Sequence, residues 1–405
     1  MPAPRWKLLV SAGLLIAAGC DSEAVTEPQP DDQNLVTLAA QRADAASEGR
    51  IVFMNWNVFI GAAIEGALGV PPELVQYAAG EAFARVLEND FASRAAAIGE
   101  EAARFQPHLI GFQEVTLFEL FNGAEFIPII DYEAILVAAL GPDYDVAAKS
   151  QNFQTPELPV TLPDVPCFAD QSCAPPPECA FIGECLLIRL TDFDLVFART
   201  DVATENPQAH RFTFNLGDGP FADPSIPFPI YRGWASVDAT IDGFELRFAS
   251  THLEPADLPD GSIVPALEQL QRLQAGELAG LIGPELPVVS VGDYNTDAYG
   301  ASTATYEDLL AYGFEDAWSQ SGDGMTCCQT EDLSIRQSIR DRRVDLIMLR
   351  GDFGLLEPGI RGAVSTRVLG SRIADLTDTG LWPSDHAGVL ATMKLPRRNL
   401  SLIHI

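Results

Sequence analysis

The stretch VGDYNTD, residues 291–297, places two acids, an amide and a glycine directly after an apolar run. Residues 287–290 before it read PVVS, which is typical of a buried strand. Taken alone, an Asp-x-Asn sequence after a strand is most often a polar turn. Asp293 and Asn295 therefore become candidate functional residues only if other segments deliver matching side chains to the same place.

The whole chain has the composition of an acidic globular protein. It has 405 residues, of which 47% are hydrophobic and 20% are charged, so it can build a sizeable core. Its formal net charge of −32 repels polyanions at long range. A nucleic-acid substrate would therefore need a local basic patch, which the sequence does not display.

The first twenty residues resemble a bacterial lipoprotein signal. Arg5 and Lys7 precede a short apolar run at 8–18, and small residues stand directly before Cys20. We expect Cys20 to be the lipidated N-terminus of an exported membrane lipoprotein that faces the periplasm or cell surface; an ordinary secretory signal peptide is the alternative. Residues 21–49 are polar and acidic, which predicts a flexible tether. The lipid would place the protein beside a membrane without making it an integral membrane protein.

Six further cysteines remain, an even number that favours disulfides in an exported protein. Four of them recur every six residues in a Pro-rich stretch that we interpret as an insertion, 156–185: Cys167, Cys173, Cys179 and Cys185. Zinc sites usually have cysteine pairs two to four residues apart, so metal binding or free thiols are the less favoured alternative. A bond between the adjacent Cys327 and Cys328 would distort the backbone between them.

Residues 50–395 are expected to form one layered α/β domain in which sheets are covered by helices. Helical patterns cover 132–140, 265–281 and 73–105, the last broken near Gly80. Asp242-Gly243 predicts a hairpin. Strand-like runs occupy 50–58, 108–114, 194–198, 211–215, 234–241, 245–250, 287–291, 344–349 and 388–393. The tail at 396–405 continues no interpretable pattern.

Polar side chains recur beside these predicted strands: most of them end a strand, Asp345 lies within one, and Asp385 and His386 precede the last one. They are Asn57, Glu114, His252, Asp293, Asn295, Asp345, Asp385 and His386. The chain has five histidines, and two of them stand in these positions. Because sheets bring distant segments to one edge, a site assembled from five separate segments is physically reasonable. The carboxylates of Glu114, Asp293 and Asp385 suit Mg²⁺ or Mn²⁺, because hard cations prefer oxygen ligands.

Six short motifs occur in a fixed order along the chain: NWNV at 55–58, GFQEV at 111–115, STHLE at 250–254, GDYNTD at 292–297, RRVDLI at 342–347 and SDHAGV at 384–389. Together they resemble the endonuclease/exonuclease/phosphatase superfamily, which includes pancreatic-type deoxyribonucleases, abasic-site endonucleases, inositol polyphosphate 5-phosphatases and neutral sphingomyelinases. The resemblance spans about residues 51–393. It implies a four-layer αββα sandwich, with two mixed β-sheets packed face to face and covered by helices.

The resemblance also implies a metal site. Glu114 stands where the superfamily holds its metal, and Asn57 stands where an amide supports the metal and the phosphate. Asp385 corresponds to an acid near a possible second metal position. Mg²⁺ is the expected ion, with Mn²⁺ as an alternative.

The remaining roles are implied in the same way. His252 matches the histidine that contacts the scissile phosphate, Asp293 the acid that orients or deprotonates water, Asn295 the amide that binds a phosphate oxygen, and Asp345 the partner of His386. Arg232 is a further phosphate-binding candidate, for which a surface ion pair is the alternative. Asp192 is the nearest candidate for an acid that supports the first histidine.

These expectations combine into a divalent-metal-dependent hydrolase of phosphoester bonds that acts outside the cytoplasm as a monomer. Acidity and membrane tethering favour a small phosphoester or a phospholipid headgroup. A secreted endonuclease of the same superfamily is the alternative within this class. A catalytically silent surface binding protein is the alternative outside it, and the competent side chain at every main motif position counts against it.

Overall fold

A computed structural model describes residues 49–63, 75–160, 186–222, 228–257, 262–300, 302–318, 324–353 and 363–394. The predicted signal, the tether up to residue 48, most of the insertion and the C-terminal tail lie outside these residues. The predicted disulfides among the four cysteines of the insertion also lie outside them. Within the described part of the chain, no helix is long and apolar enough to cross a membrane.

The first sheet has eight strands in the order β13-β14-β1-β2-β6-β4, with β3 beside β2 and β5 beside β6. The strands are β1 (Arg50–Asn57), β2 (Leu109–Phe121), β3 (Phe126–Asp131), β4 (Tyr144–Gln154), β5 (Leu158–Val160), β6 (Leu186–Arg199), β13 (Val364–Leu369) and β14 (Gly388–Lys394). β1 runs parallel to β2 and antiparallel to β14, so the sheet is mixed.

The second sheet has six strands in the order β11-β12-β10-β9-β8-β7. They are β7 (Ala203–Arg211), β8 (Gly233–Ile241), β9 (Phe244–His252), β10 (Val288–Asp293), β11 (Glu315–Asp316) and β12 (Asp345–Arg350). β10 runs parallel to β9 and antiparallel to β12. The predicted hairpin joins β8 to β9, and Asp242 and Gly243 both have the positive φ that a tight hairpin turn requires.

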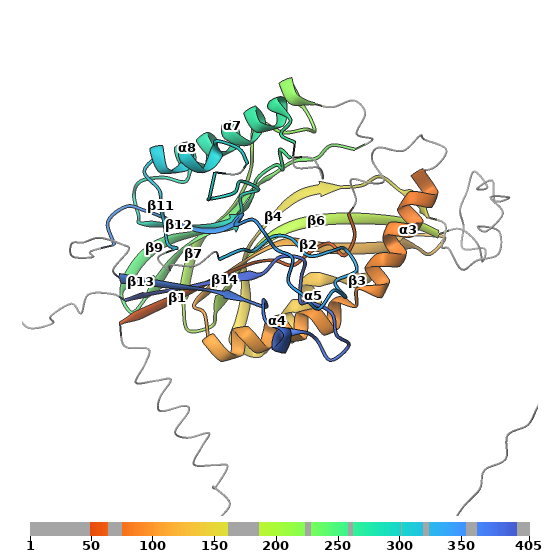
Figure 1. Cartoon of the computed structure of the whole chain (residues 1–405), viewed down its shortest axis with the longest axis horizontal. Coiled ribbons are helices and arrows are strands. Elements are labelled where there is room, and N and C mark those ends of the chain that lie inside the picture. The colour runs from red at the N-terminus through yellow and green to blue at the C-terminus, as the bar shows by residue number, and fades with distance from the viewer. Residues whose placement is uncertain are drawn as a thin grey trace, which may run out of the picture. The chain divides into compact units, whose positions relative to one another are not determined.

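Helices cover the outer face of each sheet (Figure 1). The first sheet packs against α3 (Val75–Glu88), α4 (Phe91–Phe105) and α5 (Tyr132–Leu140). The second packs against α7 (Pro265–Leu281) and α8 (Thr305–Ala311). A separate apolar core fills the space between the two sheets, where the rings of Phe53 and Phe248 stack 5.8 Å apart. The predicted four-layer αββα sandwich is therefore confirmed.

The two sheets make close polar and apolar contact near the ends of β2 and β10. Gln113 donates from Nε2 to Asn55 Oδ1 at 3.0 Å and to Ser250 Oγ at 2.9 Å, so one amide joins both sheets. Beside it, a Cβ atom at Gly111 would overlap Val291 and Ser250. This position needs glycine because the opposing sheet leaves no space for a side chain.

Several predicted boundaries were wrong: β2 continues past Glu114 to Phe121, and β6 begins at Leu186 rather than at residue 194. The long helix does not break at Gly80, which is buried inside α3, but at Asn89 and Asp90. The Asp90 side chain accepts a hydrogen bond from the backbone N–H of Ser93, and this N-cap starts α4. The strand predicted at 211–215 is displaced toward the N-terminus, because β7 ends at Arg211.

His108, between α4 and β2, lies in a buried polar contact far from the strand ends discussed above. Its ring Nδ1 accepts a hydrogen bond from the backbone N–H of Val52 at 3.0 Å, and the backbone N–H of His108 donates to the Val52 carbonyl at 2.8 Å. Burial, with a smaller contribution from the charge of Arg199, lowers the pKa of His108 from 6.5 to about 4. The imidazole is therefore neutral in the folded protein at neutral pH.

We expect a pH-dependent stability difference between the wild type and the variant His108→Asn. Below pH 6.5 the unfolded chain binds a proton at His108 that the folded chain binds only near pH 4. Folding stability is therefore lost as pH falls, by roughly 2 kcal/mol between pH 7 and pH 5. Asparagine keeps an acceptor for the Val52 N–H but does not titrate. Chemical denaturation at pH 7 and at pH 5 should therefore show that the free energy of unfolding falls by this amount more in the wild type than in the variant. Parallel stability curves would contradict the prediction.

Candidate active site

The strand ends of both sheets bring the predicted residues together. In the second sheet, Asp293 pairs with His252 on the parallel side and with Asp345 on the antiparallel side, so the three lie at adjacent positions of β9, β10 and β12. In the first sheet, Asn57 at the end of β1 pairs with Gln113, directly before Glu114. These pairings explain why residues from distant motifs meet.

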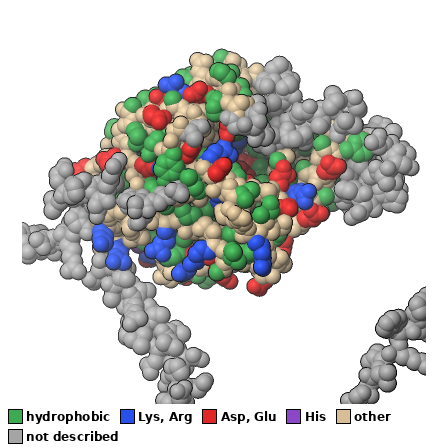
Figure 2. Space-filling model, in the orientation of Figure 1, with side chains coloured by type: hydrophobic (Ala, Val, Ile, Leu, Met, Phe, Trp, Pro, Cys, Tyr) green, Lys and Arg blue, Asp and Glu red, His purple; other side chains and the backbone are tan. Residues whose placement is uncertain are grey.

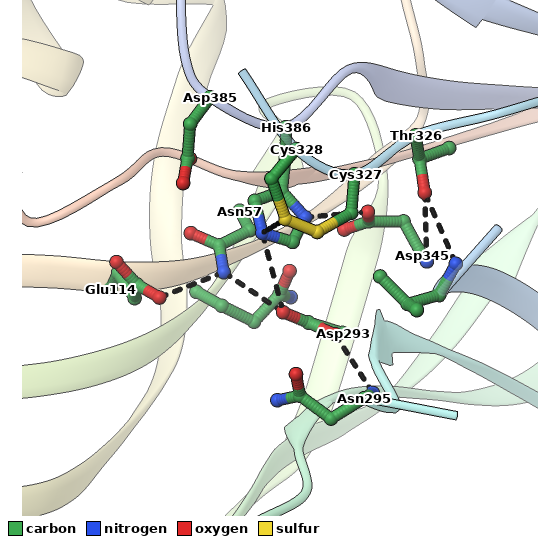
Figure 3. A network of polar contacts seen from close by, with 12 residues as sticks. Asn57, Glu114, Asp293, Asn295, Thr326, Cys327, Cys328, Asp345, Asp385 and His386 are labelled. Carbon is green, nitrogen blue, oxygen red and sulfur yellow. Dashed lines mark hydrogen bonds and ion pairs between the residues drawn. A yellow bond between two sulfur atoms is a disulfide. The ribbon is translucent and has the colours of Figure 1, made fainter. Parts of the chain in front are cut away.

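The Asn57 side chain links the two sheets at the site. Its Nδ2 donates to Glu114 Oε1 at 2.9 Å and to Asp293 Oδ2 at 3.1 Å (Figure 3). Its Oδ1 accepts from the backbone N–H of Phe59 at 3.0 Å, and the N–H of Ile60 donates to Glu114 Oε2 at 2.8 Å. Because the amide nitrogen faces both carboxylates, this geometry favours a supporting role for Asn57 rather than direct metal ligation.

Backbone irregularity helps to aim these side chains. The pairing of β2 with β6 shifts between Phe112 and Val115, and Glu114 within this bulge has a φ of 60°. Phe59 and Asn295 also have positive φ, at 62° and 49°. Such conformations are costly for residues other than glycine, and their concentration around one set of polar groups is typical of a functional site.

His386 is held as a charged imidazolium by the acids around it. Its Nδ1 lies 2.7 Å from Asp345 Oδ2, as predicted for this pair, and its Nε2 lies 3.7 Å from Asp293 Oδ2. Burial alone would lower its pKa, but Asp345, Asp385 and Asp293 together raise the pKa well above the usual value. Nε2 is thus a charged donor directed at Asp293.

His252 differs from His386 in its protonation state. Its Nε2 lies 3.6 Å from Asp293 Oδ2, while Arg232 Nη1 lies 3.0 Å from its Nδ1. A guanidinium only donates, so Nδ1 is the acceptor and Nε2 carries the hydrogen. Burial, followed by the charges of Arg232 and His386, lowers the pKa of His252 well below its usual value. This imidazole is therefore neutral.

The structure places Arg232 and Asp192 differently from the sequence-based alternatives. Arg232 is not in a surface ion pair: its side chain is 11% exposed and contacts His252, with Glu254 3.6 Å away. Asp192 accepts from Asn152 at 2.9 Å and lies near Thr116, and within the described residues no hydrogen bond joins it to His252. Arg232, rather than an acid, therefore orients the first histidine.

Asn295 and Asp293 form one turn after β10. The backbone N–H of Asn295 donates to Asp293 Oδ1 at 2.9 Å, and Asn295 Nδ2 donates to the Leu253 carbonyl at 2.9 Å. Burial, followed by the nearby charge of Asp345, raises the pKa of Asp293 to about 6 despite His386. Tyr294 between them is fully buried, as its alternation along the strand predicted.

Two buried arginines, which the sequence patterns did not single out, hold the segments that carry Asn57 and His386. Arg94 of α4 donates to four backbone carbonyls, those of Val58, Phe59, Asn89 and Pro383. Arg340 donates to those of Gly370, Ser384, Asp385 and His386. An arginine in an amphipathic helix or polar loop normally indicates solvent exposure, so no local signal reveals these roles.

The oxygen donors of the site fit a hard divalent cation. Burial raises the pKa of both Glu114 and Asp385, and the charge of Asp385 raises that of Glu114 further. Neither carboxylate is within ion-pair distance of a Lys or Arg side chain in the described part of the chain. Glu114, Asp385 and Asn295 are also only partly buried, whereas Asn57, His252, Asp293, Asp345 and His386 are buried. A cation would thus meet two partly buried carboxylates that have no Lys or Arg ion pair within the described residues.

The structure also joins Cys327 and Cys328 as a disulfide between adjacent residues. Cys328 Sγ lies 3.8 Å from His386 Nε2. The sequence gives no indication of this contact, because 58 residues separate the two side chains.

Comparison with protein-family models and with curated proteins gives no match. Among solved structures, the chain is similar to an endonuclease/exonuclease/phosphatase from Beutenbergia cavernae, at 16% identity over 86% of this chain and 72% of that chain, with a TM-score of 0.50. It is also similar to an endonuclease/exonuclease/phosphatase from Bacteroides vulgatus, at 15% identity over 86% and 99% of the two chains, with a TM-score of 0.47. It is similar as well to D. rerio TDP2 complexed with single strand DNA product, at 14% identity over 85% of this chain and 98% of that chain, with a TM-score of 0.45.

At these identities the likeness concerns the fold. The two mixed sheets with helices on their outer faces match the architecture predicted from the six motifs. The chain therefore has the endonuclease/exonuclease/phosphatase fold. The roles of the individual site residues stay predictions, supported by the geometry described above.

Proposed function

We propose that the chain is a divalent-metal-dependent hydrolase of phosphoester bonds. The observation that supports this most strongly is the position of Asp293 Oδ2. It lies 3.6 Å from Nε2 of the neutral His252 and 3.7 Å from Nε2 of the charged His386. One carboxylate thus faces two imidazoles of different charge, which is an arrangement suited to moving a proton and stabilising an anion.

In this proposal, Asp293 orients a water molecule and accepts its proton. The Nε2–H groups of His252 and His386 donate to phosphoryl oxygens, whose negative charge increases in the transition state. Asn295 has one amide hydrogen directed at Leu253 and a second available for a phosphate oxygen. Arg232 keeps the required tautomer of the neutral His252, and Asp345 accepts from Nδ1 of His386 and so fixes the orientation of its ring.

Glu114 and Asp385 would hold Mg²⁺ or Mn²⁺, with Asn57 keeping the Glu114 carboxylate in place. When bound, such an ion polarises a phosphoryl oxygen and offsets charge on the leaving oxygen. This proposal rests on the donor chemistry of the two partly buried carboxylates, because their oxygens are the ligands that hard cations prefer.

For the substrate, we propose a small phosphoester or a phospholipid headgroup. The net charge of −32 disfavours a polyanion. Figure 2 shows acidic and basic side chains interspersed over the face it presents, with several Lys and Arg side chains along its lower edge. Export and lipidation at Cys20, both predicted from the sequence, would place the site beside a membrane and so support a lipid substrate.

The test is a substrate panel for the purified protein. We expect Mg²⁺-dependent hydrolysis of sphingomyelin vesicles or of a small phosphoester, a fall of at least about 100-fold after chelation, and recovery when Mg²⁺ is restored. The variant Asp293→Asn, prepared in parallel, measures contaminating activity. Preferential cleavage of plasmid DNA would establish the endonuclease alternative instead. Absence of turnover on every member, or turnover that survives chelation, would overturn the proposed function.

A further inference from the structure

The sulfur atoms of Cys327 and Cys328 lie against the catalytic histidine proposed above. Cys327 Sγ, Cys328 Sγ and His386 Nε2 are all within 4.8 Å of one another. Figure 3 shows both sulfurs beside His386, and shows Glu114 on the other side of Asn57. The proposed hydrolytic mechanism uses neither sulfur.

The distance between the sulfurs and the imidazole is fixed by the backbone on both sides. The N–H of Ala387 donates to the Thr326 carbonyl at 2.8 Å, just before the cysteine pair. The N–H of Gln329 donates to the Asp385 carbonyl at 2.8 Å, just after it. The segment with the cysteines is therefore attached to the segment with His386 at two points, and the three donor atoms remain near one another.

His386 already has the orientation of a metal-ligating histidine toward the sulfurs. Asp345 holds Nδ1 at 2.7 Å, so Nε2 is the ring atom that faces the cysteine pair. A carboxylate on the second ring nitrogen is the usual support for an imidazole that binds a metal through the first. Arg342 adds positive charge, because its Nη2 lies 3.4 Å from Cys327 Sγ and 3.7 Å from Cys328 Sγ. That charge would favour the anionic sulfurs that ligate metals.

We propose that reduction of the Cys327–Cys328 disulfide creates a binding site for a thiophilic divalent cation such as Zn²⁺ or Cd²⁺, formed by the two sulfurs and His386 Nε2. Two sulfurs and one imidazole nitrogen are soft and borderline donors, in contrast to the oxygen donors of Glu114 and Asp385. A cation held there occupies the Nε2 that donates to phosphate. Reduction followed by cation binding therefore inhibits hydrolysis, and this consequence rests on the proposed function.

The two steps balance chemically. A dithiol reductant supplies two electrons and two protons, the sulfur–sulfur bond breaks, two thiols form and the reductant becomes a disulfide. Cation binding then forms two sulfur–metal bonds and one nitrogen–metal bond, and both thiol protons, together with the Nε2 proton, pass to solvent without electron transfer. In the oxidised protein the sulfurs are bonded to each other, so the site does not exist.

The binding test uses Cd²⁺ alone as the probe, with the full chain reduced and then freed of reductant without air. Sulfur-to-cadmium charge-transfer absorbance and equilibrium dialysis report the number of bound ions. We expect reduced wild type to bind one more equivalent than the double variant Cys327→Ser/Cys328→Ser, which keeps every other cysteine. Oxidised wild type should lack this equivalent. His386→Gln should weaken its binding at least tenfold, because one of three ligands is lost.

Equal cadmium binding by reduced wild type and the double serine variant would overturn the proposal. The proposal would also be overturned if reduced wild type binds the extra equivalent but the His386→Gln variant binds it with the same affinity. If the double variant does not fold, the single variant Cys328→Ser provides the same comparison.

A second measurement follows turnover in Mg²⁺ as Zn²⁺ is added. Inhibition should require about tenfold less Zn²⁺ for reduced than for oxidised wild type. Absence of turnover would contradict only the proposed function, because cadmium binding is measured independently.

Discussion

Replacing Asp293 with asparagine is expected to lower the turnover number for Mg²⁺-dependent phosphoester hydrolysis about 1000-fold, the middle of the range for loss of a general base. Asparagine has the same shape and can keep the hydrogen bond from the Asn295 backbone, but it cannot accept a proton from water. The charge that faces Nε2 of both histidines is also lost. Steady-state kinetics on the substrate identified in the panel would measure the effect.

Asp297→Asn is the matched control because it makes the same chemical change in the same VGDYNTD stretch. The Asp297 carboxylate accepts from the backbone N–H groups of Tyr299 and Arg343, whereas the ion pairs of the two site histidines are with Asp293 and Asp345. We expect this variant to retain turnover within about threefold of wild type while losing roughly 1 kcal/mol of folding stability. Similar turnover losses in both variants would show that Asp293 acts through the fold of the turn rather than through its carboxylate.

Replacing Arg94 with methionine is expected to reduce the free energy of unfolding by about 3–5 kcal/mol. Methionine fills much of the same volume, but four backbone carbonyls lose their charged donor: those of Val58, Phe59, Asn89 and Pro383. These carbonyls lie in three separate segments, so the substitution loosens the contacts of α4 with the ends of β1 and with the segment before His386. Turnover should fall as well, because Asn57 and His386 depend on those segments.

Arg104→Met on the same helix is the control for this prediction. The Arg104 side chain is 54% exposed and its ion pair with Glu101 is 3.7 Å long, so its loss should change stability by no more than about 0.5 kcal/mol. Urea denaturation followed by circular dichroism would measure both variants. An Arg94→Met protein whose stability lies within 1 kcal/mol of wild type would contradict a structural role for the buried guanidinium.

The sequence predicted the layers of the fold because apolar runs mark the buried strands, and it gave a set of candidate site residues whose roles stay predictions. Polar residues next to the apolar runs gave the candidates Asn57, Glu114, His252, Asp293 and His386, which the structure brings together, although Glu114 lies in a bulge inside β2 and His386 lies before β14. The prediction of strands from apolar runs failed for β7, whose residues are almost all exposed at the edge of the sheet. Such a strand has no buried face to impose alternation, and the register shift around Pro207 interrupts its pairing further.

Two further features depend on contacts that the sequence patterns above did not reveal. Arg232 was considered as a phosphate ligand or a surface residue, but its side chain is only 11% exposed, contacts His252 and determines the tautomer of that histidine. Gly80 looked like a helix breaker, yet it packs inside α3 because the N-cap of Asp90 defines the boundary instead. For Arg232 the deciding contact is with a residue twenty positions away, and for the helix boundary it is the hydrogen bond from the Ser93 backbone N–H to the Asp90 side chain.

The contact between the sheets at Gly111 and Gln113 has a consequence for how this protein can change over evolutionary time. Asn57 and Glu114 belong to one sheet and Asp293 to the other, so the spacing of the sheets sets the 3.1 Å hydrogen bond that joins them. A larger side chain at residue 111 would push against Val291, in the same strand as Asp293. Gly111 and Val291 therefore contribute to the geometry of the site as well as to stability, although neither supplies a polar group to it.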